Sequence, residues 1–91
     1  MITAFITFTV EPGHVGALAE RLLEIPGIKE VYSVAGPYDL VAIARVKEHE
    51  ALSDLVTEHV AKLDGILGTE TLIAFRAFSR KDLGAIWDIG N

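Results

Sequence analysis

The sequence predicts an α+β domain in which a four-stranded antiparallel sheet carries two helices on one face. Stretches with the two-residue period of a strand and stretches with the period of a helix follow one another in the order βαββαβ. The second half of the chain repeats the pattern of the first, and 91 residues suit a single domain. The predicted sheet is apolar on both faces, so we expect the chain to act as an oligomer and not as a lone monomer.

The first strand is predicted over residues 2–10, where side chains alternate in polarity and most are β-branched or aromatic. Residues 11–13 (Glu-Pro-Gly) break it. A helix follows over residues 14–24, because apolar residues recur every three to four positions and form one stripe. The Pro-Gly pair at 26–27 ends this helix.

Two strands joined by a tight turn come next, over residues 29–35 and 38–47. Gly36 and Pro37 favour a turn between them, since proline presets φ and glycine accepts φ values that other residues resist. The second of these strands is apolar on both faces as far as Arg45, a pattern typical of a central strand covered on both sides.

A second helix is predicted over residues 49–63 and a fourth strand over residues 68–78. Residues 1–78 thus form the domain, and residues 79–91 form a C-terminal tail with a short helix. Trp87 in this tail packs either on its own domain or on a neighbouring subunit, and the pattern does not decide between them.

An internal repeat fixes the topology. Placing residues 26–28 (Pro-Gly-Ile) on residues 64–66 (Asp-Gly-Ile) also superposes the apolar stripes of the two helices. Two βαβ units in tandem give the ferredoxin-like sandwich, with the first and third strands in the centre of the sheet.

The face of the sheet without helices is predicted to be too apolar to remain in water. We expect it to form the dimer interface, by back-to-back pairing of two sheets, through Phe5, Val41, Ile43, Ile73 and Phe75. Threonines at positions 3, 7 and 71 are expected among them. A monomer with this face exposed is the alternative.

Composition excludes several classes of function. The chain has no cysteine, which excludes a disulfide scaffold and a thiolate metal site. A net charge of −5 with scattered basic residues argues against direct nucleic-acid binding. No apolar run reaches membrane-spanning length and no signal peptide is recognisable, so we expect a soluble cytoplasmic protein.

Catalytic and cofactor motifs are missing from the sequence. His14, His49 and His59 share no helix face and so form no metal site, and His59 is expected at the edge of the core. The glycines form no phosphate-binding loop, and no serine lies in a nucleophile elbow. We therefore predict a protein that is not an enzyme and that needs no cofactor.

Two clusters are candidates for a binding site. Gly36-Pro37-Tyr38-Asp39 is either a plain turn or a site in which the Tyr38 ring and the Asp39 carboxylate meet an ammonium group. Thr69-Glu70-Thr71 places two hydroxyls on one face, where they serve either as ordinary strand residues or as ligands of a carboxylate or amine.

The order and spacing of several motifs resemble the effector-binding (RAM) domain of Lrp/AsnC, or feast/famine, regulators over about residues 1–75. The segment 34–40 resembles the V-T-G-x-Y-D hairpin of that domain, and the resemblance continues through residues 11–13, 25–31, 55–60, 64–66 and 69–73. Members of the family carry an N-terminal helix-turn-helix, whereas this sequence starts at the first strand. It is therefore expected to be a stand-alone version.

The resemblance implies a function and a site. Family members pair through their sheets, often assemble four dimers into a ring, and bind small amino acids at the contacts between dimers. By resemblance, the ligand site comprises Gly36, Tyr38, Asp39, Leu40, Thr69 and Thr71. Asp39 and backbone amides would hold the charged groups of the amino acid. A full-length regulator of the family is a further expected partner.

Three functional hypotheses follow. The first is an amino-acid-binding and oligomerisation module that modulates amino-acid-responsive regulation. The second is a small dimeric α+β barrel enzyme of monooxygenase or isomerase type, which a cavity above the sheet holding His59 or an ordered acid would favour. The third is an oligomerisation domain with an empty site, distinguished by whether a ligand-sized cavity forms around Tyr38 and Thr69 at a subunit boundary.

Overall fold

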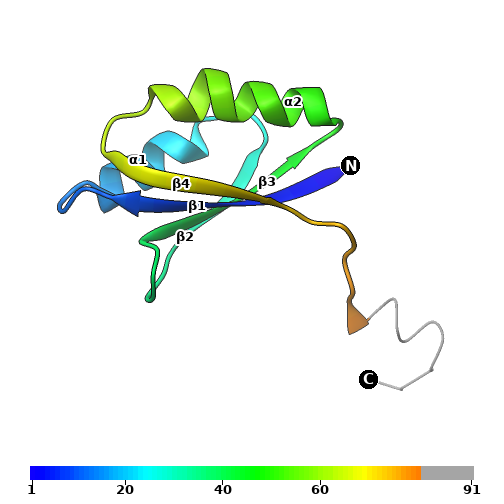
Figure 1. The fold of residues 1–91 in the computed structure, drawn as a ribbon, viewed down its shortest axis with the longest axis horizontal. Coiled ribbons are helices and arrows are strands. Elements are labelled where there is room, and N and C mark those ends of the chain that lie inside the picture. The colour runs from blue at the N-terminus through cyan, green and yellow to red at the C-terminus, as the bar shows by residue number, and fades with distance from the viewer. Residues whose placement is uncertain (81–91) are drawn as a thin grey trace.

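The computed structural model describes residues 1–80, and its elements follow the expected order (Figure 1). The elements are β1 (Ile2–Val10), α1 (Val15–Leu23), β2 (Ile28–Ser33), β3 (Leu40–Val46), α2 (His49–Asp54), the π-helix η1 (Leu55–His59), the 3₁₀-helix η2 (Val60–Lys62) and β4 (Ile66–Ile73). The strands form one antiparallel sheet in the order β2-β3-β1-β4, and the helices lie on one side of it. The predicted α+β ferredoxin-like fold is confirmed.

The core lies between the sheet and the helices. Alternate residues of β1, namely Ala4, Ile6 and Phe8, are completely buried, and Leu18 and Leu22 of α1 pack in the same buried cluster. Ala42 and Ala44 of β3 are equally buried. Small side chains at these central positions let the helices approach the sheet closely. The alternate positions of β1 and β3 that the sequence assigns to one face are thus the positions that the helices cover.

The second helical segment differs from the expected continuous helix over residues 49–63. After α2 the backbone widens into the π-helix and then tightens into the 3₁₀-helix, and the N–H of Val60 is donated to the carbonyls of Leu55 and Val56. The Thr57 hydroxyl also donates to the carbonyl of Ser53 over 2.8 Å, a contact that bends helices. Sequence periodicity does not resolve such a change of winding.

The fourth strand corrects part of the predicted interface. In an antiparallel pair, residues opposite each other point to the same face. Ile73 lies opposite the buried Ala4, so it belongs to the helix side and not to the other face, and the same holds for Thr71 opposite Ile6. Leu72, opposite Phe5, takes the place expected for Ile73.

The helix-free face is the sheet surface that bears Phe5 and Thr7 of β1 and the residues opposite them in β3 and β4. Val41 and Ile43 lie on it, as expected from the sequence. Phe75 follows the end of β4 and is fully exposed. The interface prediction therefore keeps Phe5, Val41 and Ile43 on this face.

The predicted fourth strand over residues 68–78 begins earlier and ends earlier, although the N–H of Ala74 still donates to the carbonyl of Thr3 over 2.9 Å. Most of the predicted tail, with Trp87, lies outside the described residues. Every helix within residues 1–80 is too short or too polar to span a membrane.

Candidate functional site

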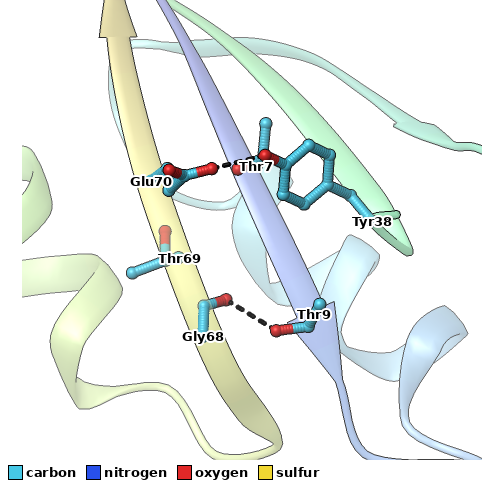
Figure 2. Close-up of a pocket in the computed structure, with 6 residues that line it drawn as sticks. All are labelled: Thr7, Thr9, Tyr38, Gly68, Thr69 and Glu70. Atoms are coloured by element: carbon cyan, nitrogen blue, oxygen red, sulfur yellow. Dashed lines mark hydrogen bonds between the residues drawn. The ribbon is translucent and has the colours of Figure 1, made fainter. Parts of the chain in front are cut away.

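A pocket of about 280 Å³ opens at one end of the helix-free face, beside the β2–β3 hairpin (Figure 2). Its lining comes from β1, the hairpin and β4, and consists of Thr7, Thr9, Tyr38, Gly68, Thr69 and Glu70. The volume is just below the range usual for pockets that bind drug-sized molecules, so it suits a ligand of about the size of an amino acid. A ligand-sized cavity therefore forms around Tyr38 and Thr69.

Tyr38 and Glu70 form the wall of this pocket. The Tyr38 ring reaches across β1, and its hydroxyl donates to Oε1 of Glu70 on β4 over 2.5 Å (Figure 2). This hydrogen bond, together with the nearby negative charge of Glu70 and slight desolvation, raises the pKa of Tyr38 above its ordinary value, while the Thr7 hydroxyl acts weakly in the opposite direction. The phenol is therefore protonated at neutral pH and serves as a donor.

Thr7 lies beneath this wall. Its side chain is on the helix-free face but only 5% exposed, and its hydroxyl makes no hydrogen bond of normal geometry with any group in residues 1–80. The phenol oxygen of Tyr38 is beside it in Figure 2, close enough for the effect on the Tyr38 pKa. Thr9, two residues further along the strand, donates a long hydrogen bond of 3.4 Å to the carbonyl of Gly68.

The polar groups of Asp39 form hydrogen bonds to the main chain of other residues. One carboxylate oxygen, Oδ2, accepts the main-chain N–H of Val10 over 2.8 Å. Its own N–H donates to the carbonyl of Phe8 over 2.8 Å, and its carbonyl accepts the N–H of Val34 over 3.1 Å. Asp39 therefore fastens the hairpin to the end of β1.

Of the six predicted ligand residues, some line the pocket and others lie away from it. Tyr38 and Thr69 line the pocket, although Thr69 lies opposite the buried Phe8 and turns its side chain to the helix side. Leu40 is 1% exposed and belongs to the core. Gly36 occupies the open tip of the hairpin, with φ at +127°, and Thr71 belongs to the helix side.

Sequence reasoning assigned no ligand-binding role to three lining side chains, those of Thr7, Thr9 and Glu70. The alternation of β1 was a usable signal for the first two, because Thr7 and Thr9 are polar positions on the face that also carries Phe5. In the sequence Glu70 has no distinguishing feature beyond its position between two threonines. Its position opposite Thr7 depends on the β1–β4 register, which the sequence does not state.

The rest of the helix-free face is largely apolar. A second hollow, of about 360 Å³, lies at the other end of β1 and is lined by Met1, Thr3, Phe5, Arg45, Ala74, Phe75, Arg76 and Ala77. Phe5 is 38% exposed and Leu72 is 55% exposed. The pocket beside Tyr38 therefore lies at the rim of an apolar surface.

The histidines do not form a site within the part of the chain that the structure describes. His14 lies at the start of α1 and is exposed, with Nδ1 3.3 Å from the carbonyl oxygen of Pro12. His59 is exposed, so its expected place at the core edge is wrong; the adjacent Val60 takes the buried position. The shallow cleft that holds His59 is lined by helix and loop residues and not by the sheet. Residues 1–80 contain no cluster of side chains able to hold a metal ion.

The fold agrees with a comparison to known families. The model of the Lrp/AsnC ligand binding domain matches residues 3–83, and the chain therefore belongs to this family. The transcriptional regulator FL11 of Pyrococcus furiosus is 36% identical over 75 residues, which are 82% of this chain and 49% of that protein. The chain thus spans about half the length of the curated relatives it matches, which are transcriptional regulators and not enzymes.

Solved structures give the same result. TTHA0845 from Thermus thermophilus is 51% identical with a TM-score of 0.82, and the match covers 88% of this chain and all of that one. The feast or famine regulatory protein Rv3291c of M. tuberculosis, solved in complex with L-methionine, is 28% identical with a TM-score of 0.69. That match covers 87% of this chain and 53% of Rv3291c.

Proposed function

We propose that these residues form an amino-acid-binding and oligomerisation module that modulates amino-acid-responsive transcription regulation. The observation that carries this proposal is the position of the pocket at the rim of the apolar helix-free face. A second copy covering that face would also border the pocket. Ligand binding and subunit association would then stabilise each other, because each depends on the same surface.

The ligand class is supported by the size and polarity of the pocket and by a relative. The polar side chains of Thr7, Thr9, Tyr38 and Glu70 line a space suited to a small zwitterion. The related Rv3291c binds L-methionine. A small amino acid is therefore the ligand we propose for this chain.

The proposed assembly is a homodimer formed back to back through Phe5, Val41 and Ile43, and then a ring of four dimers. A full-length regulator of the same family would be an additional partner in the cytoplasm. Direct contact of these residues with nucleic acid is not part of the proposal, because a net charge of −5 repels phosphate.

Calorimetric titration with each of the common amino acids tests the proposal, together with light scattering before and after ligand addition. Heat of binding and an increase in the oligomeric fraction are expected with at least one of them. Tyr38→Ala removes the pocket wall and should abolish both effects. Tyr32→Ala is the matched control, since Tyr32 is half exposed and lines no part of the pocket. Absence of heat with every amino acid would overturn the proposal.

A further inference from the structure

We infer that Glu70 is the residue that accepts the ammonium group of the ligand, and that Asp39 is a positioning residue that does not touch the ligand. This inference rests on the proposed function and specifies the chemistry of its site. Of the two nearby carboxylates, those of Asp39 and Glu70, only one is available to a molecule in the pocket.

The Asp39 carboxylate is already engaged. Its Oδ2 accepts the N–H of Val10, and its main-chain groups bind Phe8 and Val34. The residue does not line the pocket. Oδ1 of Asp39 could accept a further hydrogen bond, but the residue lies outside the lining of the pocket, so a ligand held there meets Glu70 and not Asp39.

Glu70 has the opposite properties. It lines the pocket, its side chain is exposed, and the Tyr38 hydroxyl binds Oε1. Oε2 is left to accept from a ligand, since each carboxylate oxygen can accept two hydrogen bonds. The Tyr38 hydroxyl also fixes the direction of the carboxylate, so a ligand does not have to order it.

The other lining groups determine the class of ligand. No lysine, arginine or histidine is among the six lining residues, so the pocket presents one negative charge and no positive one. A charge-assisted hydrogen bond to an ammonium group is about twice as strong as a neutral one. The pocket therefore selects molecules with an ammonium group and gives no ionic partner to a ligand that has only a carboxylate.

Thr7 is a second, independent sign of a polar ligand. It is only 5% exposed, its hydroxyl lies under the Tyr38–Glu70 pair, and that hydroxyl lacks a hydrogen bond of normal geometry within residues 1–80. A buried hydroxyl without a partner is costly. An ammonium bound to Glu70 would supply the missing donor to this hydroxyl once the Tyr38 ring above it shifts, because the hydroxyl oxygen has almost no exposed surface while the ring covers it.

The test compares isosteric substitutions that remove one charge each. Calorimetric titration with the common amino acids is carried out on the wild-type chain and on the variants Glu70→Gln, Asp39→Asn and Glu30→Gln. Glu30 is the matched control, because it lies on the same sheet, also accepts a hydrogen bond from a tyrosine hydroxyl (that of Tyr32), and lines no pocket with Tyr38.

For every amino acid that binds the wild type, Glu70→Gln should lower the affinity by about tenfold or more, the usual effect of losing a charged partner. Asp39→Asn keeps a carbonyl oxygen for Val10 and should leave the affinity nearly unchanged, as should Glu30→Gln. An affinity loss with Asp39→Asn and none with Glu70→Gln would overturn the inference and leave the proposed function standing. No binding by the wild type would overturn both.

A second experiment keeps the wild-type protein and removes one charged group of the ligand at a time. L-Methioninamide keeps the ammonium and loses the carboxylate, whereas the 2-hydroxy acid analogue of methionine keeps the carboxylate and loses the ammonium. Shifts of the Thr7 and Glu70 amide resonances are expected with the amide and not with the hydroxy acid. The reverse order would overturn the assignment of Glu70.

Discussion

The main-chain N–H of Val10 donates to Oδ2 of Asp39 over 2.8 Å and thereby connects the last residue of β1 to the β2–β3 hairpin. The connection spans 29 positions of the sequence. It places Tyr38, the residue before Asp39, over β1 and within reach of Glu70. The pocket thus depends on a hydrogen bond that is not part of it.

We expect Asp39→Ala to lower the free energy of unfolding by about 1.5–3 kcal/mol, because it removes a charged acceptor and leaves the Val10 N–H without a partner. Chemical denaturation followed by circular dichroism measures the change. Asp39→Asn retains an acceptor oxygen, so its free energy of unfolding should fall by less than that of Asp39→Ala. Equal stability of the alanine variant and the wild type would contradict this role.

The stability of the fold should fall in alkaline solution through two tyrosines. The pKa of Tyr38 is raised by its hydrogen bond to Glu70 and by the charge of that carboxylate, and the pKa of Tyr32 is raised in the same way by Glu30. A raised pKa means that the folded state holds the proton more tightly than the unfolded state. The contribution is therefore complete below the unfolded pKa of about 10 and is lost as the pH rises through the folded pKa.

Phenolate absorbance as a function of pH checks this expectation. Glu70→Gln should return the pKa of Tyr38 towards its ordinary value and leave Tyr32 unchanged, and Glu30→Gln should do the reverse. Two tyrosines that titrate normally in the wild type would show that these contacts do not persist in solution.

The fold could be predicted because its signals are local. Alternation in β1 and the Gly36-Pro37 turn each specify a short segment. The internal repeat relates the two halves as βαβ units, and right-handed crossovers then leave one strand order. The phase of β4 could not be read in the same way. Leu72 and Ile73 are both large and apolar, so either could face the core, and the register that decides between them includes an irregularity between Thr9 and Val10.

The candidate site could be predicted only in part, for a related reason. Tyr38 stood out as an aromatic residue beside an acid at a turn, and it lines the pocket. The partner of Asp39 is a main-chain N–H far away in the sequence, and no side-chain pattern encodes such a contact. Glu70 reaches Tyr38 only through the pairing of β1 with β4.

Two glycine substitutions should have opposite effects on stability. Gly27 has φ at +102°, and a Cβ there would lie 2.9 Å from Cδ1 of Leu55 and 3.1 Å from Cγ1 of Val46. Gly27→Ala should therefore cost about 1–3 kcal/mol through backbone strain and overpacking. Gly16 lies in α1 with open space around it, so Gly16→Ala should stabilise the fold by about 0.5–1 kcal/mol. Thermal unfolding of both variants measures the difference in stability. If both variants lose the same amount of stability, the packing argument at Gly27 is refuted.

Phe5→Glu should convert the proposed dimer into a monomer. Phe5 lies at the centre of the helix-free face, opposite Ile43 on one side and Leu72 on the other, and a charge there would be buried against its own copy in a symmetric pair. Burial of an aromatic side chain contributes about 1.5–3 kcal/mol, and it is lost twice, so the dissociation constant should rise by about a hundredfold or more. Light scattering after size-exclusion chromatography measures the molar mass. Leu23→Glu is the control, because Leu23 is 52% exposed on α1, away from this face. If Phe5→Glu keeps the mass of the wild type, or if Leu23→Glu lowers it equally, the chains associate through another surface.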